Sequence, residues 1–318
     1  MTPQEPATLA RKSEYSDSFQ STKRRRRDFA DDEVFSAEDQ ARFEEMRTEF
    51  DEGPTDDGPP TGDRWSIWWD SEPLQRGPEP RPDWVITEHG AVDYELGVLK
   101  TGKEADVFLI ERALPGTDRA VILAAKRYRS AEHTQFNRAG DYTAGRGAKR
   151  SRDARAMAKR TAFGLEQAAG RWAASEFDAL KRLYEVGAPV PYPVQILGTE
   201  VIMEFIGHGR TAAPRLAETR PDPDELDHLW DQAAEALRLM TEQGFAHGDL
   251  SPYNTVVHDG RLVVLDLPQI VDIYANPLGR EFLLRDVENI GTWFTARGMP
   301  RQEVDDLLTE LAAITRMP

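Results

Sequence analysis

The sequence predicts an α+β fold, in which a small antiparallel sheet with one helix is followed by a mainly helical half. Short apolar runs separated by polar turns fill the first part of the domain, and one amphipathic helix lies among them. Long helical patterns dominate the remainder of the chain. This order predicts two lobes with a cleft between them, and such clefts are where ligands bind.

The strands are expected in the stretch that follows Trp84. The segment "YELGVLKTGKEADVFLIER" holds two apolar runs around a tight polar turn at Thr101 to Glu104, which predicts a hairpin. A third strand, "RAVILAAKRYR", is apolar on both faces until Lys126, and "TEVIMEFIGHG" is a further strand. A strand that is apolar on both faces must be covered on both sides. We expect the amphipathic helix to cover one face, so the group that covers the other face bears on the function.

The predicted helices are amphipathic, and the first two end at glycines. The segment "GRWAASEFDALKRLYEVGAPVP" carries one apolar stripe, with Gly187 as its C′ residue. A long helix over Pro223 to Gln243 stops at Gly244. Two C-terminal helices are expected at about Gly279 to Arg297 and Arg301 to Arg316.

Composition and charge restrict the possible functions. The chain of 318 residues has a formal net charge of −16, which argues against nonspecific binding to nucleic acid or to anionic membranes. It contains no cysteine, which excludes disulfides, thiolate catalysis and cysteine metal sites. The start has no apolar signal region, and no later apolar run is long enough to cross a bilayer. We therefore expect a cytoplasmic protein without membrane contact.

The chain is expected to divide near residue 83. Residues 1–82 are mostly charged and turn-forming, which predicts a largely disordered extension with a short helix at Ala37 to Glu49. Residues 83–318 then form the domain, with an N-lobe at about 83–203 and a C-lobe at about 207–318. The three tryptophans of "RWSIWWD" are expected to dock onto this domain, with a partner-binding motif as the alternative.

A polar stretch beside a predicted hairpin carries the candidate chemistry. In "HGDLSPYNTVVHDGRLVVLD" the Asp-Gly pair predicts a two-residue turn. Counting back from this turn pairs Asn254 with Leu265, so Asp266 lies beside Asn254, where paired strands are about 5 Å apart. An amide oxygen and a carboxylate at that separation can share one Mg²⁺ ion. Asp249 lies in the loop at the same end, beside the metal but not on it.

These groups are the minimum equipment for phosphoryl transfer, in which positioning and charge neutralisation do most of the catalysis. The phosphates need a cation, which Lys126 can supply, and Ala124 on the same strand face leaves room for a flat base. Glu176, in the middle of the first helix, is placed to pair with Lys126. Each feature has a plainer interpretation: "HGDLSPYN" as a polar turn that caps a helix, the lysine as a surface residue, and "TGKE" as an ordinary turn.

The order of these features is that of a protein-kinase-like fold, and the sequence resembles the RIO family of atypical serine/threonine protein kinases. It is most similar to the first, type-1-like subfamily, as a bacterial member. The matching strings are "LKTGKEADVF", "AAKRYR", "EFDALKRL", "MEFIG", "HGDLSPYN", "LDLPQ" and "REFLLRDVENI", within Ile86 to Phe294. The resemblance implies a two-lobed RIO-type fold whose C-lobe lacks an activation loop.

By this resemblance Asp249 is the catalytic aspartate, and Asn254 and Asp266 are metal ligands, with Asp266 also a candidate aspartyl-phosphate site. Lys126 and Glu176 are the pair that orients ATP. The resemblance places the remaining nucleotide contacts in the loop over the phosphates and in the hinge backbone, at Lys100, Gly102, Lys103, Glu204 and Ile206. ATP and Mg²⁺, with Mn²⁺ as an alternative, are the implied cofactors.

The leading interpretation is a Mg²⁺- and ATP-dependent serine/threonine protein kinase that autophosphorylates, with an unidentified protein substrate. The alternatives are an ATPase switch that acts through an aspartyl phosphate in ribosome-related assembly, a small-molecule kinase, and a non-catalytic nucleotide-binding scaffold. The basic stretch at 144–160 is the predicted contact for RNA or a ribosomal precursor, with a plain solvated loop as the alternative. Ser151 and Thr161 are candidate autophosphorylation sites, and His247 is expected to brace the catalytic loop.

Overall fold

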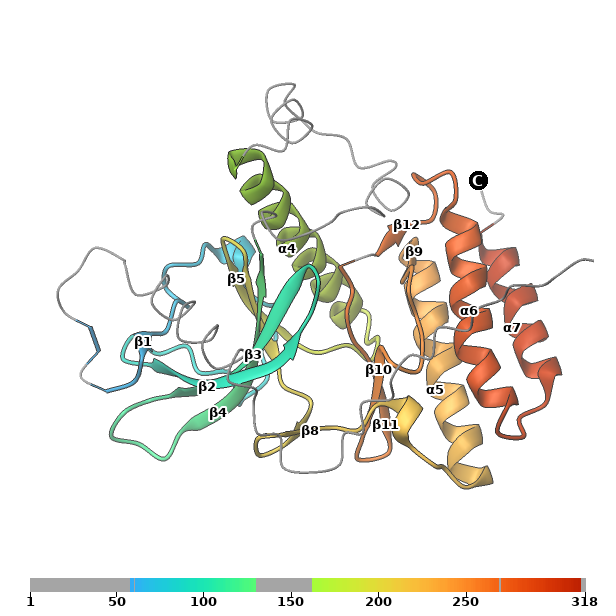
Figure 1. The fold of residues 1–318 in the computed structure, drawn as a ribbon, viewed down its shortest axis with the longest axis horizontal. Helices are drawn as coiled ribbons and strands as arrows, with labels where there is room; N and C mark the ends of the chain where they lie inside the picture. Colours follow the sequence, from blue (N-terminus) through green and yellow to red (C-terminus); the bar gives the residue numbers. More distant parts are fainter. Residues whose placement is uncertain (1–57, 60, 130–161, 269, 316–318) are drawn as a thin grey trace, which may run out of the picture. The chain divides into compact units, whose positions relative to one another are not determined.

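A computed structural model describes residues 58–59, 61–129, 162–268 and 270–315 of the chain (Figure 1). All of them belong to one contact unit, Phe43–Pro318. Three expectations lie outside the described residues: the disorder and short helix within residues 1–57, the basic stretch at 144–160, and the acceptor sites Ser151 and Thr161.

An antiparallel six-stranded sheet in the order β1-β2-β3-β4-β6-β5 forms the first half of the described part. Its strands are β1 (Arg64–Trp65), β2 (Val92–Thr101), β3 (Ala105–Ala113), β4 (Ala120–Tyr128), β5 (Pro193–Leu197) and β6 (Glu200–Glu204). The predicted hairpin and the two further strands are confirmed. Strand β5 was not predicted, because Pro189, Pro191 and Pro193 at and before its start are typical of a turn. It lies at an edge of the sheet, and Pro193 is its first residue, where a missing N–H is tolerated.

The segment before residue 83 also contributes to the sheet. Strand β1 pairs with β2, and Arg64 donates to both carboxylate oxygens of Glu200 at 2.9 and 3.0 Å. The expected docking is confirmed for Trp68, which is buried, whereas Trp65 and Trp69 are 42% and 47% exposed. Composition concealed this contribution, because the partners of these side chains lie far along the sequence.

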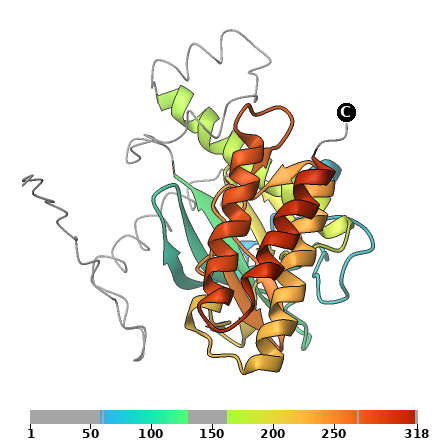
Figure 2. The same cartoon turned by 90° about the vertical axis from the view of Figure 1, so that its right-hand side faces the viewer.

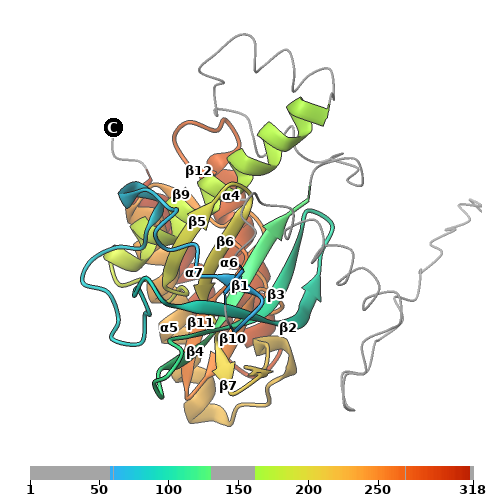
Figure 3. The ribbon, with the colours of Figure 1, turned by 90° about the vertical axis from the view of Figure 1, so that its left-hand side faces the viewer.

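The described α-helices are α4 (Ala162–Glu185), α5 (Pro223–Glu242), α6 (Gly279–Thr295) and α7 (Arg301–Ile314), and two short 3-10 helices lie at Pro73–Gln75 and Leu216–Glu218. Helix α4 contacts β4, β5 and β6 of the sheet (Figure 3). Helices α5, α6 and α7 contact one another, and Figure 2 shows them side by side. Gly187 and Gly244 have φ values of +80° and +78°, the left-handed conformation expected just beyond these helix ends. None of the helices in the described ranges is long and apolar enough to span a bilayer.

Short antiparallel strand pairs follow the sheet along the chain: β7 (Gly207–His208) with β8 (Thr211–Ala212), β9 (Phe245–Ala246) with β12 (Val271–Asp272), and β10 (Thr255–His258) with β11 (Arg261–Val264). In the last pair Val257 faces Leu262, which confirms the predicted register. One apolar core lies among α5, α6, α7 and this hairpin, and a second lies against the sheet. The half-buried side chain of Tyr184 packs against both cores, so it ties the halves together.

Candidate active site

Lys126, near the end of β4, directs its amine at two carboxylates. Its Nζ lies 2.6 Å from Oε1 of Glu176 on α4 and 3.1 Å from Oδ1 of Asp266, which follows β11. Burial alone would lower the pKa of Lys126, but Glu176 and Asp266 together raise this pKa above its ordinary value. The buried amine therefore stays a cation at neutral pH.

Local structure explains how these groups meet. Side chains alternate along β4, so Ala124 and Lys126 lie on the face toward α4 and Tyr128 follows on the same face. Glu176 is buried in α4, where its neighbours Ala173 and Phe177 pack against the sheet. The Tyr128 hydroxyl donates to Oε2 of Glu176, so this carboxylate is held on both sides.

Tyr128 was not predicted from the sequence. The signal that could have found it is the two-residue spacing from Lys126, which places two polar side chains on one strand face. Burial raises the pKa of the Tyr128 phenol, and the adjacent Glu176 carboxylate raises it further. Tyr128 therefore remains a hydrogen-bond donor to Glu176.

Asp266 is shared by two lysines. Its Oδ2 lies 2.6 Å from Nζ of Lys100, on β2, while Oδ1 faces Lys126. The backbone of Asp266 has a φ of +61°, a left-handed conformation that aspartate tolerates better than most residues, so the chain turns sharply as it leaves β11. Burial would raise the pKa of Asp266, but Lys126 and Lys100 hold this pKa below its ordinary value.

Asp249 and Asn254 lie together in the loop before β10. The Asn254 amide nitrogen donates to the Asp249 carbonyl at 2.9 Å and lies 3.5 Å from Oδ2 of Asp249. The Leu265 N–H donates to the Asn254 carbonyl at 2.8 Å, so the hairpin pairing extends to Asn254 and Asp266 follows it directly. The structure thus brings Asn254 and Asp266 to neighbouring backbone positions, although their side chains have different partners.

Two buried side chains fix the shape of this loop. His247 lies with Nε2 2.9 Å from the Leu265 carbonyl, and its Nδ1 accepts from the Asp249 N–H at 3.3 Å, which confirms the expected bracing role. Asp286, on α6, accepts from the backbone N–H groups of Gly248 and Leu250 at 2.8 and 3.0 Å. Asp286 was not predicted, because nothing in the sequence links a helical aspartate to a loop 38 residues away.

The turn between β2 and β3 requires a glycine. The Gly102 N–H donates to the Ala105 carbonyl at 3.0 Å, and a Cβ at this position would lie 2.7 Å from the same oxygen. Lys103 is exposed beside it. The structure brings Lys100 to Asp266, whereas the exposed Lys103 has no such contact among the described residues.

Glu204 and Ile206 lie where the sheet passes into the helical half. The Glu204 N–H donates to the Tyr192 carbonyl, and the Ile206 carbonyl accepts from the Ala213 N–H, each at 2.9 Å. A cavity of about 500 Å³ is lined in part by these two residues. Lys126 and Asp266 do not line it, so this cavity is separate from the lysine–carboxylate network.

The donor set fits a magnesium nucleotide. Asp266 is a carboxylate at neutral pH, and the amide oxygen of Asn254 is available because the amide nitrogen is directed at Asp249. Both are oxygen ligands of the kind that Mg²⁺ prefers. Lys100 and Lys126 add two positive charges, which can attract phosphate oxygens.

Comparisons with known proteins give one consistent family. A family model described as RIO domain matches residues 116–307. The chain is 34% identical over 213 residues to the RIO-type serine/threonine-protein kinase Rio1 of Haloferax volcanii, a match that covers 67% of both chains. It is 34% identical over 132 residues to the serine/threonine-protein kinase RIO1 of Saccharomyces cerevisiae, covering 40% of this chain and 27% of that protein.

A nematode relative and a solved structure are also similar to the chain. The match to the serine/threonine-protein kinase RIO1 of Caenorhabditis elegans has 31% identity over 209 residues, and covers 64% of this chain and 38% of that protein. Among solved structures, the Rio2 kinase-ADP/Mg²⁺-phosphoaspartate complex from Chaetomium thermophilum is similar with a TM-score of 0.47 and 21% identity. That similarity covers 67% of this chain and 60% of the other.

Proposed function

The chain belongs to the RIO family, and from this premise we propose that it is a Mg²⁺- and ATP-dependent serine/threonine protein kinase that autophosphorylates. The relatives named above are serine/threonine protein kinases, which supports the activity. The observation that carries the proposal is the charge network in which Lys126 lies between Glu176 and Asp266. This network combines a buried cation with a carboxylate that can leave it for a metal ion.

The two lysines would bind the phosphates of ATP. Lys126 is held in place by Glu176, so little side-chain freedom remains to be lost when it binds a phosphate. Lys100 is half exposed and can turn from Asp266 toward an incoming anion. Because phosphate oxygens compete with Asp266 for both ammonium groups, nucleotide binding would release the Asp266 carboxylate.

The released carboxylate and the Asn254 amide oxygen would hold Mg²⁺. When bound, this ion neutralises charge on the phosphate oxygens. An adenine would meet the backbone at the end of β6. Since the Glu204 N–H and the Ile206 carbonyl already have partners, the adenine would use the Glu204 carbonyl and the Ile206 N–H.

Asp249 would accept the proton of the attacking hydroxyl. Its side chain is exposed, so an incoming serine or threonine can reach it, while its backbone is fixed through His247. The exposed carboxylate and the braced backbone support this role.

The test is the Asp249→Asn variant, assayed for transfer of labelled phosphate from ATP and for binding of the magnesium–nucleotide complex. We expect transfer to be lost and nucleotide affinity to be retained. The matched control is Asp231→Asn on the exposed surface of α5, which should behave as the wild type. Undiminished transfer by Asp249→Asn would contradict the proposed role.

A second candidate function is an ATPase switch with Asp266 as the phosphate acceptor. The observation that favours it is that Asp266 lies between two lysines, which would stabilise the charge of an aspartyl phosphate. Product analysis separates the two functions. A serine phosphate survives acid, whereas an aspartyl phosphate is lost on treatment with hydroxylamine.

Other assignments remain predictions. Contact of the basic stretch 144–160 with RNA or a ribosomal precursor is tested by neutralising Lys149, Arg150, Arg152 and Arg155 and measuring salt-sensitive RNA binding. A cytoplasmic location also stays a prediction. Rapid turnover of a small alcohol would favour a small-molecule kinase over the proposed function, and full cellular function of Asp249→Asn would favour a non-catalytic scaffold.

A further inference from the structure

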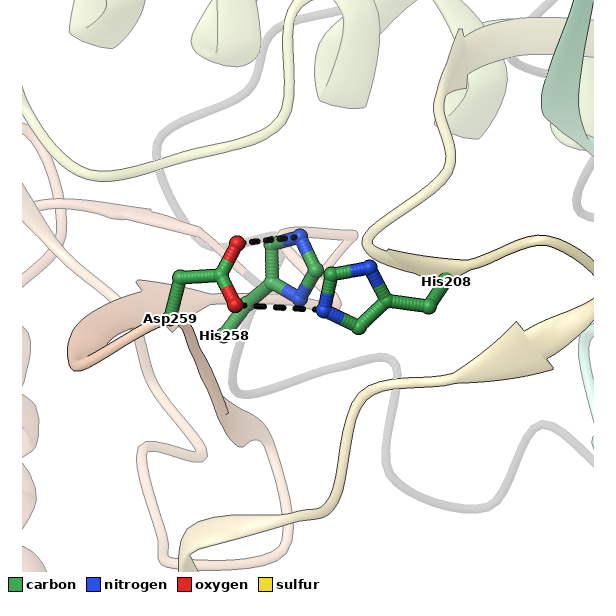
Figure 4. Close-up of side chains that lie close together, drawn as sticks. All are labelled: His208, His258 and Asp259. Atoms are coloured by element: carbon green, nitrogen blue, oxygen red, sulfur yellow. Dashed lines mark hydrogen bonds and ion pairs between the residues drawn. The ribbon is translucent and has the colours of Figure 1, made fainter.

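We propose that His208, His258 and Asp259 form a binding site for a divalent transition-metal ion, with Zn²⁺ as the representative ligand. The three side chains converge from two different hairpins (Figure 4). One ligand atom from each residue lies within 4.8 Å of the other two. This cluster is separate from the proposed magnesium ligands Asn254 and Asp266.

The carboxylate of Asp259 lies between the two imidazoles. Its Oδ1 is 3.1 Å from Nε2 of His208, and its Oδ2 is 3.6 Å from Nε2 of His258. The ring centroids of the two histidines lie 4.5 Å apart. Figure 4 shows the rings beside each other, each with one nitrogen directed at the carboxylate.

These separations suit a tetrahedral ion. Zn–N and Zn–O bonds of about 2.0–2.1 Å place neighbouring ligand atoms about 3.3 Å apart. The two histidine–carboxylate separations straddle that value, so small side-chain rotations would bring one oxygen and both nitrogens to a shared ion. Two imidazoles and one carboxylate form a set that binds first-row transition metals, whereas Mg²⁺ prefers oxygen ligands throughout.

The backbone holds the ligands in place. Asp259 and Gly260, with φ values of +50° and +74°, form the tight turn between β10 and β11. His208 ends β7 and pairs with Thr211 across the next turn. The side chains of His208 and Asp259 are 76% and 67% exposed, so water can supply the fourth ligand and the ion can enter without unfolding.

Two arginines lie near the three proposed metal ligands, one across the hairpin and one along the chain. Arg261 pairs with His258 across the hairpin, and Arg210 lies two residues after His208. The Arg210 guanidinium lies 3.8 Å from Glu111, so a carboxylate outside the cluster balances its charge. Asp259 is then the acid that offsets the charge of the metal ion.

The proposed metal site lies beside the segment that connects the sheet to the helical half. Strand β7 begins directly after Ile206, and the hairpin β10–β11 leads at its other end to Asn254 and Asp266. A metal ion bound at the turn would therefore restrain the linker between the two halves against the hairpin. An effect on nucleotide binding rests on the proposed function, but the metal site does not.

The test measures Zn²⁺ binding to the full-length chain without an affinity tag, in the absence of nucleotide and magnesium, by calorimetry. Co²⁺ absorption in the visible region reports the coordination. We expect His208→Ala and His258→Ala each to weaken binding more than about tenfold. Asp259→Asn should weaken it as well while keeping the turn, because Asn-Gly favours the same turn type. The control is His228→Ala on the exposed surface of α5, which should leave the affinity unchanged.

Thermal unfolding supplies a second measurement. Zn²⁺ should raise the unfolding midpoint of the wild type and of His228→Ala but not that of the double variant His208→Ala/His258→Ala. Equal Zn²⁺ affinity and equal midpoint shifts in the wild type and the double variant would overturn the proposal. An equal loss in His228→Ala would also overturn it. Phosphate transfer by the same variants is a separate assay, so a failed kinase proposal leaves this result interpretable.

Discussion

Replacing Glu176 by alanine removes the carboxylate that Lys126 and Tyr128 share. In the wild type the Lys126 amine has two acidic partners, Glu176 Oε1 at 2.6 Å and Asp266 Oδ1 at 3.1 Å. In Glu176→Ala, Asp266 is the ion-pair partner that Lys126 keeps among the described residues, and this carboxylate also serves Lys100. We expect the freed lysine to move fully onto Asp266.

The free-energy cost of Glu176→Ala depends on the ion pair that Lys126 keeps with Asp266. A buried charge left without any partner costs about 3–5 kcal/mol, but Lys126 keeps one carboxylate, so this range is an upper bound. The loss is closer to that of one hydrogen bond between charged groups, about 1.5–3 kcal/mol. If the substitution weakens the nucleotide-bound state by this amount, the affinity for magnesium–ATP falls roughly 10- to 100-fold, at about 1.4 kcal/mol per factor of ten.

The assay compares Glu176→Ala, Glu176→Gln and Glu185→Gln for magnesium–ATP affinity and for phosphate transfer. Glu185→Gln is the matched control, because Glu185 is exposed at the end of the same helix. Glutamine can still accept from Lys126, so Glu176→Gln should recover part of the loss, which a purely structural role for Glu176 would not predict. If Glu176→Ala folds normally and matches the control in both measurements, the reasoning is refuted.

The remaining predictions concern stability. Asp93 makes a bidentate ion pair with Arg112 at 2.7 and 3.0 Å, fully buried in the sheet, so Asp93→Ala should lower the free energy of unfolding by about 3–5 kcal/mol in urea titration. Glu88→Ala, which removes the half-buried surface partner of Arg119, is its control, and a loss no larger than the control's would contradict the prediction. For Glu200, burial alone would raise the pKa, but two arginines lower it to about 2. Because its pKa is lowered on folding, Glu200 stabilises the fold at pH values above the ordinary pKa of 4.5, and this contribution is lost as the pH falls toward 2. The stability of Glu200→Gln should therefore fall less than that of the wild type over this pH range. Parallel pH profiles of the two proteins would rule this out.

Local patterns in the sequence predicted much of the fold. The Asp-Gly turn fixed the register of β10 and β11 up to Asn254, because a two-residue turn leaves one way to pair the flanking strands. Alternation along β4 put Lys126 on the face that α4 covers. Gly187 and Gly244 marked two helix ends, because few other residues adopt a left-handed conformation without strain.

Contacts between distant segments were beyond such patterns. Lys100 and Asp266 lie 166 residues apart, and no spacing in the sequence indicates that their side chains meet. The same holds for Asp286, whose hydrogen bonds to Gly248 and Leu250 depend on how α6 packs. The tryptophan segment belongs to the sheet for a similar reason, since Arg64 finds Glu200 only after folding.

The position of Asp266 between lysines of the sheet has a mechanical consequence. Lys100 and Lys126 belong to strands of the first half, whereas Asp266 extends from a hairpin that packs with the helical half. Two ion pairs therefore link the two halves, and separating the halves requires both ammonium groups to leave one carboxylate. Dissolved salt weakens the ion pair at Lys100 most, because Lys100 is the more exposed of the two lysines. Ionic strength should therefore determine how readily the two halves separate.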